Sequence, residues 1–206
     1  SVARGKDRIK PVLPGNAVAP ATLLPGQVVL SLEPGYYRIG IEAFDRISKK
    51  RAAAVRTVSL AGCGGSPALS DIQFASGLGE AGENTRFVKN GLLVVPHPCR
   101  AYRKPFPLSF YFEIYGLDAD AEGRVFYRIE YKIVPIEKKR WGPVFIETPM
   151  TISSSFETSG YGSTQPQRLS IATDELWEGP FRLDVTVTDR RSFRAATKSE
   201  DFSILK

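Results

Sequence analysis

Two alternating segments inside Pro107–Ile136 constrain the fold of this chain most strongly. Their apolar positions are Leu108, Phe110, Phe112 and Ile114 in the first segment, and Val125, Tyr127, Ile129, Tyr131 and Ile133 in the second. A period of two places one set of side chains on a buried face, so each segment is predicted to be a half-buried β-strand. The DADAEG sequence between them is typical of a turn, and the two strands are therefore predicted to pair as a hairpin.

Short segments of the same kind continue along the chain, and none has the 3.6-residue period of an amphipathic helix. Further strands are predicted at Tyr37–Ala43, Val55–Leu60, Phe87–Val95, Met150–Phe156 and Phe181–Val187. Many short strands separated by turns predict an all-β fold in which two sheets pack face to face. The predicted core between the sheets includes Phe110, Phe112, Ile129, Leu183 and Val185.

An internal repeat links the two ends of the chain. A shift of 144 residues aligns the segment that starts at Gly35 with the segment that starts at Gly179, without a gap. Seven of the 26 aligned positions are identical, and the apolar positions match in character. Each copy is predicted to be a hairpin in which an aspartate, Asp45 or Asp189, holds the turn.

The repeat also predicts the domain organisation. More than 100 residues of predicted strands precede the second copy, whereas only 34 residues precede the first. We therefore predict tandem immunoglobulin-like β-sandwiches, the first abbreviated or truncated and the second complete. Residues 1–62 form a leader and a partial sandwich that ends in the hairpin, 63–67 form a Gly-rich linker, and 68–206 form the complete sandwich.

Composition narrows the possible partners. The net charge of +6 is small for 206 residues and is not gathered into a long basic arm, so a nucleic-acid partner is not expected. No apolar run approaches the roughly 18–20 residues that cross a bilayer, so contact with a membrane is expected only through a partner. The chain begins at Ser1 without an initiator Met, as expected of a processed product or an excised fragment.

The two cysteines leave two interpretations open. Cys63 and Cys99 form no CxxC motif, and the single histidine, His97, provides no zinc-ligand spacing. A Cys63–Cys99 disulfide would suit an extracytoplasmic protein and would attach the linker to the second sandwich. The alternative is two unpaired thiols.

The catalytic and cofactor motifs are weak. Gly77–Gly82 matches GxGxxG, but no amphipathic helix follows it, so it is predicted to be a loop. Asp118, Asp120 and Glu122 resemble part of a calcium loop that lacks its final glutamate. No GxSxG motif accompanies His97. We therefore predict no enzyme activity, no catalytic residue, no cofactor and no metal site.

Charged and aromatic residues supply the candidate contact sites. Two basic clusters are predicted to meet an acidic partner or phospholipid headgroups, and their members are Arg46, Lys49, Lys50, Arg51, Lys138, Lys139 and Arg140. Exposed aromatic residues would suit a sugar-stacking platform or a protein contact, and the candidates are Tyr111, Tyr115, Phe126, Trp141, Tyr161 and Trp177.

Several segments together resemble a known family. They are SDI at 70–72, FVKNGLLVVPHP at 87–98, PLSFYFEIYGL at 107–117, GRVFYRIEYKI at 123–133 and EGPFRLDVTVTD at 178–189. This pattern resembles the C-terminal region of bacterial GWxTD-domain proteins, and the similarity covers roughly residues 30–206. The resemblance implies Ig-like sandwiches and an extracytoplasmic location, in the periplasm or at the cell surface. The Gly-Trp-x-Thr-Asp motif itself is absent, so no family site residue is carried over.

These observations favour a non-enzymatic structural or interaction protein. The expected role is an accessory subunit that docks onto a larger cell-envelope assembly, because the first copy of the hairpin has too few strands to bury its own apolar face. The alternative is a ligand-binding module of glycan type, which would use the aromatic residues and the loops predicted at 76–86 and 159–167.

Overall fold

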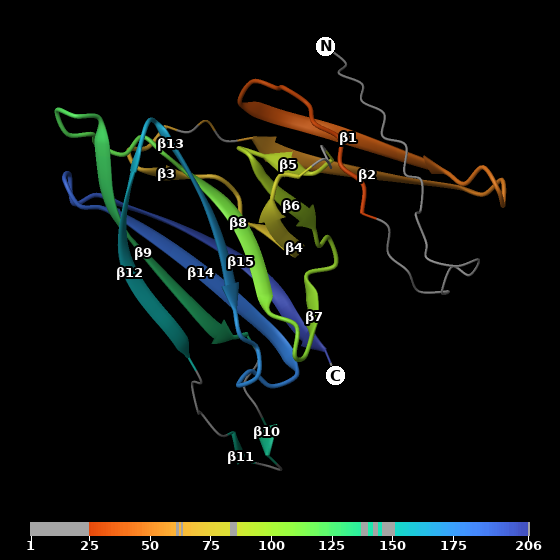
Figure 1. Cartoon of the computed structure of the whole chain (residues 1–206). Coiled ribbons are helices and arrows are strands. Elements are labelled where there is room, and N and C mark those ends of the chain that lie inside the picture. Colours follow the sequence, from red (N-terminus) through yellow and green to blue (C-terminus); the bar gives the residue numbers. More distant parts are fainter. Residues whose placement is uncertain are drawn as a thin grey trace. The chain divides into compact units, whose positions relative to one another are not determined.

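The computed structural model describes residues 25–60, 62, 64–82, 86–136, 140–141, 144–145 and 151–205. The described chain is all-β and falls into two compact units, one over Val29–Gly64 and one that begins at Gly65 (Figure 1). This division lies at the linker predicted over 63–67. No helix long and apolar enough to cross a bilayer occurs within these described ranges.

The larger unit contains two main sheets. The five-stranded sheet has the order β12 (Ile152–Tyr161), β9 (Arg124–Pro135), β14 (Gly179–Asp189), β15 (Ala195–Leu205) and β7 (Ala101–Arg103). The six-stranded sheet has the order β13 (Thr164–Ile171), β8 (Leu108–Tyr115), β4 (Gln73–Glu80), β6 (Leu92–Pro96) and β5 (Val88–Lys89), and β3 (Ala68–Leu69) also pairs with β8. The short strands β10 (Arg140–Trp141) and β11 (Val144–Phe145) pair separately.

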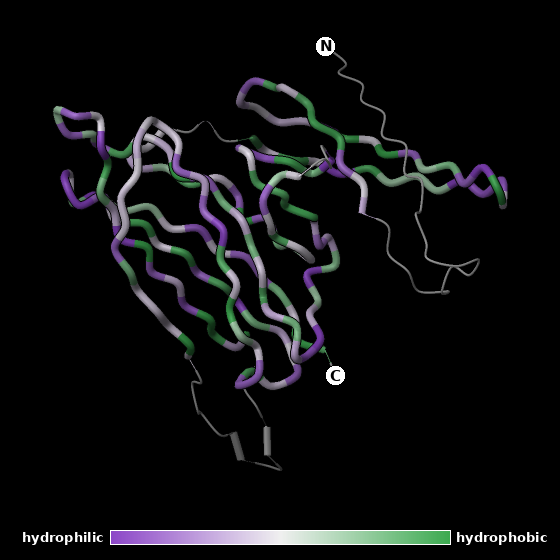
Figure 2. The backbone as a smooth tube through the Cα atoms, viewed as in Figure 1, coloured by the Kyte–Doolittle hydropathy of each residue, from purple (hydrophilic) through white to green (hydrophobic). Residues whose placement is uncertain are grey.

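The core of this unit lies between the two sheets, as expected for a β-sandwich. All five predicted core residues have no exposed surface: Phe110, Phe112, Ile129, Leu183 and Val185. They come from β8, β9 and β14, and they belong to one continuous apolar cluster. The hydropathy of these strands alternates along the chain (Figure 2), which is the pattern that burial of one face produces. The predicted all-β sandwich is therefore confirmed.

The hairpin predicted over Pro107–Ile136 is wrong, although both of its strands exist. β8 lies in the six-stranded sheet and β9 lies in the five-stranded sheet. The connection turns at Gly116, whose φ of +65° favours glycine, and carries the chain from one sheet to the other. Alternation shows which face of a strand is buried, but it does not show which strand lies beside it. Two strands that face each other across a sandwich therefore have the same sequence pattern as two strands that pair in one sheet.

Two segments predicted as loops are strand in part. The segment predicted as a loop at 159–167 contains the end of β12 and the start of β13, with only Gly162 and Ser163 between them. The loop predicted at 76–86 begins inside β4, where Gly77 and Gly79 pair with β6 beside an irregularity in the register. The first four of the six residues that match GxGxxG are therefore strand.

The smaller unit is a single antiparallel hairpin of β1 (Gly35–Phe44) and β2 (Arg51–Leu60). Its register runs from Gly35 opposite Leu60 to Phe44 opposite Arg51. β14 and β15 pair in the same register, from Gly179 opposite Ile204 to Thr188 opposite Ala195. Every pair is shifted by the 144 residues of the sequence repeat, so the predicted structural repeat is confirmed.

The two turns repeat in atomic detail. Asp45 N–H donates to the Lys50 carbonyl at 2.9 Å, and Asp189 N–H donates to the Arg194 carbonyl at 2.9 Å. The aspartate Oδ1 accepts a main-chain N–H two residues later in both copies, at 2.9 Å in the first and 2.7 Å in the second. Lys49 and Phe193 occupy the same left-handed conformation, each with a φ of +58°.

Candidate functional site

The β1–β2 hairpin exposes its apolar residues. None of its residues is buried, and Tyr36 and Ile41 are 87% and 60% exposed. The inward positions of β14, which correspond to Tyr37, Ile39, Ile41 and Ala43, are all fully buried, and they are Phe181, Leu183, Val185 and Val187. Because the local structure is the same in both copies, the difference lies in the strands and the opposite sheet that surround β14.

The edges of the two hairpins differ as well. β14 pairs with β9 along Phe181–Asp189. β1 pairs only with β2 in the part of the chain that the structure describes. A long unpaired edge is a template for another strand. The hairpin therefore offers both an apolar face and an unpaired edge.

The first basic cluster surrounds the turn of this hairpin. Arg46, Lys49, Lys50 and Arg51 are all exposed. Arg51 lies 5.1 Å from the centre of the Phe44 ring and 3.6 Å from the Glu42 carboxylate. The turn thus presents positive charge beside the apolar strands. In the second cluster, Lys138 and Lys139 and the side chain of Arg140 lie outside the described residues.

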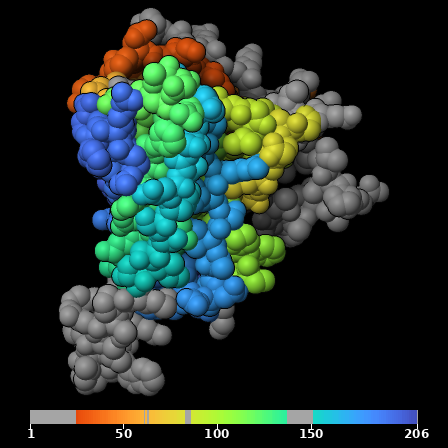
Figure 3. Space-filling view, turned by 60° about the vertical axis from the view of Figure 1, so that its left-hand side comes forward, coloured from red at the N-terminus to blue at the C-terminus, as the bar shows by residue number. Residues whose placement is uncertain are grey.

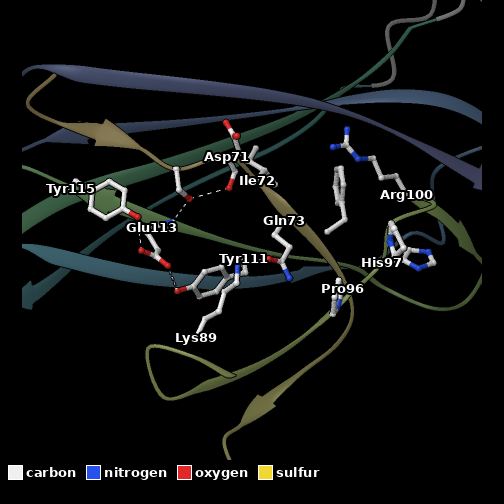
Figure 4. A pocket seen from close by; sticks show the side chains of 13 residues that line it. Asp71, Ile72, Gln73, Lys89, Pro96, His97, Arg100, Tyr111, Glu113 and Tyr115 are labelled. Carbon is white, nitrogen blue, oxygen red and sulfur yellow. Dashed lines mark hydrogen bonds between the residues drawn. The ribbon is translucent and has the colours of Figure 1, made fainter. Parts of the chain in front are cut away.

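A pocket of about 440 Å³ lies on the six-stranded sheet of the larger unit. Its walls are the segment Ser70–Phe74, the residues that follow β6, Lys89 of β5 and the outward face of β8 (Figure 4). Asn90 Nδ2 donates to the Tyr111 hydroxyl at 2.9 Å, although β5 and β8 are separated by two strands in the sheet order. The sheet therefore curls, and this curl forms the hollow.

One wall of the pocket carries a tyrosine–glutamate network. The Tyr111 hydroxyl donates to Glu113 Oε1 at 2.8 Å, and the Tyr115 hydroxyl donates to Glu113 Oε2 at 2.5 Å. Burial, together with the hydrogen bond to Glu113, raises the pKa of Tyr111 to about 12. Tyr111 is therefore a neutral hydroxyl at physiological pH, and the network is a fixed set of acceptors and donors.

Beside this network lies a buried amide group. Gln73 Oε1 accepts a hydrogen bond of 2.5 Å from Lys89 Nζ, and Lys89 lies 5.7 Å from the centre of the Tyr111 ring. Gln73 Nε2 is buried and makes no hydrogen bond to any of the described residues. An unsatisfied buried donor costs about 1–3 kcal/mol, and an acceptor oxygen in the pocket would recover this energy.

The candidate histidine and cysteines do not form a reactive group. His97 Nε2 lies 2.8 Å from the Ala101 carbonyl, and the ring packs edge-on against Tyr102 at 4.7 Å. His97 is therefore held by structural contacts at the pocket rim. Cys99 is exposed with a free thiol. Cys63 lies outside the described residues, so a bridge between the two cysteines stays a prediction.

The acidic loop before β9 is occupied by arginine contacts. Arg124 bonds to Asp120 at 3.0 Å and to Glu122 at 3.4 Å, and Asp118 lies 3.7 Å from Arg194. Hydrogen bonding, first of all with the Arg124 main chain, lowers the pKa of Asp120. Within the described ranges no group of three acidic, histidine or cysteine residues is placed to hold a metal ion.

The aromatic candidates do not gather into one platform. Tyr111 is buried, Trp177 packs on Phe181 with ring centres 5.5 Å apart, and the Trp141 side chain lies outside the described residues. Tyr161 is 70% exposed at the end of β12. Tyr115 is the aromatic candidate besides Tyr111 that lines the pocket. Sequence reasoning missed Gln73, Lys89 and Glu113. The pairing of β4 with β8 brings Gln73 close to Glu113, and the curl of the sheet adds Lys89.

No model of a known protein family and no curated protein matches this sequence. The resemblance to the C-terminal region of GWxTD-domain proteins therefore stays a prediction.

Proposed function

We propose that this protein is a non-enzymatic structural and interaction protein that joins a larger assembly through its β1–β2 hairpin. The observation that carries the proposal is the contrast between the two copies of the repeat. The inward residues of β14, together with Phe202 and Ile204 of β15, are buried by the surrounding sandwich, whereas no residue of β1–β2 is buried. A lone two-stranded hairpin is marginally stable in water, so a hairpin of ten-residue strands needs a covering partner.

The chemistry of the hairpin indicates what the partner offers. An apolar surface would cover Ile39 and Ile41, and an acidic rim would face Lys49, Lys50 and Arg51 around the turn. Apolar contact would hold such a complex, and the charges would mainly speed association and make it salt-sensitive. We place this role in an accessory subunit of a bacterial cell-envelope assembly, outside the cytoplasm, with Ig-like architecture, as the family resemblance implies.

Site-specific photo-crosslinking in the native cell tests the proposal. A photoreactive residue at Ile41 is expected to give a discrete product heavier than two copies of the chain. The matched control places the same group at Tyr161, which is similarly exposed but lies in the larger unit. Replacing Lys49, Lys50 and Arg51 by Glu should reduce the Ile41 product and leave the folding of the larger unit unchanged. Equal labelling from Ile41 and Tyr161 would contradict the proposal.

The pocket supports a second candidate, a ligand-binding module of glycan type. Lys89 Nζ donates to Gln73 Oε1 and therefore lies close to Nε2 of the same amide group. These two nitrogens are donors for one oxygen-bearing group of a ligand. The Glu113 carboxylate and the tyrosine hydroxyls add hydrogen-bonding groups that suit a sugar. The loops on which the sequence argument relied are strands in part, so this candidate now depends on the pocket.

Titration of the protein with neutral and carboxylate-bearing oligosaccharides, followed by NMR, tests this second candidate. Resonances of the pocket residues should shift with the carboxylate-bearing sugars. Gln73→Leu should weaken binding about tenfold, since a lost hydrogen bond to a charged group costs about 1.5–3 kcal/mol. Thr186→Ala, on the other sheet, is the control. Unchanged affinity in Gln73→Leu would remove the basis for this candidate.

A further inference from the structure

The structure defines which residues of β1 direct their main-chain N–H and C=O groups to its unpaired edge. In an antiparallel pair, residues that bond to the partner alternate with residues whose main-chain groups point away. Asp45 N–H donates to the Lys50 carbonyl, so the odd-numbered residues of β1 bond to β2. The even-numbered residues from Tyr36 to Phe44 therefore direct their N–H and C=O groups to the outer edge.

The repeat shows that the equivalent edge is the paired one in β14. The Pro180 carbonyl accepts the Ile136 N–H at 3.1 Å, and Arg190 N–H donates to the Phe126 carbonyl at 2.9 Å. Between these two bonds β14 pairs continuously with β9. By contrast, β15 pairs on its outer side with only the three residues of β7. The edge of β1, rather than that of β2, is thus the one whose counterpart a full strand covers.

The residues of β1 complement each other when the strand is reversed about Gly40. In an antiparallel pair of two β1 strands centred there, Arg38 lies opposite Glu42 and Ile39 lies opposite Ile41. Tyr37 then lies opposite Ala43, and Tyr36 lies opposite Phe44. Each of these pairs occurs twice, as an interface with two-fold symmetry requires. Gly40 can occupy the centre of this pair, because it is one of the even-numbered residues whose main-chain groups point to the outer edge.

The charges of β1 favour pairing with a second copy of β1 over pairing with an unrelated strand. Arg38 has no carboxylate within ion-pair distance among the residues that the structure describes, and Glu42 makes only an exposed 3.6 Å contact with Arg51. A reversed copy of β1 supplies the missing acid to Arg38 and a second base to Glu42. Opposite charges directly across a sheet stabilise the pairing, and like charges oppose it. A Cβ at Gly40 would meet no atom, so the face of the strand is open at its centre.

We propose that two copies of this chain pair edge to edge through β1, antiparallel about a two-fold axis at Gly40. The resulting four-stranded sheet keeps Tyr37, Ile39, Ile41 and Ala43 of both copies on one face. This self-association does not depend on the larger assembly proposed above. It would double the apolar face that such an assembly could cover.

Charge reversal tests the register. Sedimentation equilibrium of the full chain should show a dimer. Arg38→Glu alone should raise the dissociation constant at least about tenfold, because it places Glu opposite Glu twice. Glu42→Arg alone should do the same by placing Arg opposite Arg. Arg56→Glu, the same charge change on β2, is the matched control and should leave the dimer unchanged.

Mixing the two single variants gives the decisive result. A chain with Glu at 38 and a chain with Arg at 42 complement each other at both pairs, so their mixture should form a heterodimer. The double variant Arg38→Glu/Glu42→Arg should again form a homodimer. The inference is overturned if the wild-type chain is a monomer, or if the mixture stays monomeric while the wild type dimerises. Neither outcome bears on the crosslinks from Ile41 to a larger partner.

Discussion

The two hairpins of this protein have the same local structure in different surroundings. β1–β2 and β14–β15 share their register, the hydrogen bonds of their turns and a left-handed residue at the same place. Yet Phe181 has no exposed surface, whereas its counterpart Tyr37 is half-buried and donates to the Glu33 carbonyl at 2.6 Å. The hairpin itself is therefore specified locally, and burial is supplied by neighbours.

This difference separates two sources of stability. Pairing and turn bonds fix the shape of both hairpins. Full burial of a large apolar side chain contributes about 1.5–3 kcal/mol, and only the second copy receives that contribution at four successive inward positions. The turn of the second copy also has a neighbour, because Asp118 N–H donates to Asp189 Oδ2 at 2.7 Å. In Figure 3 this turn, in blue, adjoins the green loop before β9.

Proline at equivalent edge positions should produce the largest contrast. Asp184→Pro removes an N–H that faces β9 in a central strand, so we expect the larger unit not to fold. Asp184→Ala is the control for the lost side chain. Gly40→Pro removes only an N–H at the outer edge of β1. Its β1–β2 pairing, followed by hydrogen exchange, should persist while the dimer is lost, and loss of both would show that the edge was assigned to the wrong residues.

Truncation of the repeated aromatic residue should give the next effect. Phe181 packs against Phe202 and Trp177, with ring centres 5.7 and 5.5 Å away. Phe181→Ala should lower the free energy of unfolding by about 3–5 kcal/mol in chemical denaturation. Tyr37→Ala should leave the unfolding transition of the larger unit at the wild-type midpoint. A shift of similar size in both variants would mean that the two hairpins are equally buried.

The turn aspartates should differ in their pH dependence. Burial alone would raise the pKa of Asp189, but the N–H groups of Asp118, Arg191 and Ser192 together lower it below its usual value. A lowered pKa in the folded state stabilises the protein above about pH 4 and is lost as the pH falls through the folded-state pKa. Asp189→Asn should therefore cost about 1.5–3 kcal/mol at pH 7 and flatten the acid limb of the stability curve.

Asp45→Asn is the matched control for that experiment. The Ser48 hydroxyl and the Ile47 N–H, in that order, lower the pKa of Asp45, but this carboxylate is exposed. Its substitution should leave the pH dependence of the larger unit unchanged. If Asp189→Asn retained the wild-type acid limb, the shared turn geometry would carry no charge-dependent stability.

Sequence patterns predicted strands and faces better than they predicted neighbours. The alternation in β8 and β9 identified Phe110 and Ile129 as core residues, but it could not show that these strands lie in opposite sheets. The repeat predicted that the same hairpin forms twice, and the two copies share their register because register is set by the turn and by local alternation. The pocket was not predictable, because Gln73, Lys89 and Glu113 come from three strands, and alternation specifies neither the order of those strands nor the curl of their sheet.

The smallest effect concerns an arginine that both copies share. In β14, Arg182 bonds to Asp201 on its own hairpin at 2.9 Å, and the pair is exposed. Exposed ion pairs contribute little to stability, so Arg182→Ala should leave the unfolding free energy within experimental error. In the first copy Thr57 stands in place of this aspartate, so Arg38 can pair with Glu42 of a second chain instead. Arg38→Ala should therefore be equally silent in unfolding yet weaken the dimer in sedimentation. An unchanged dimer would show that Arg38 serves only as a solvated surface charge, as its counterpart does.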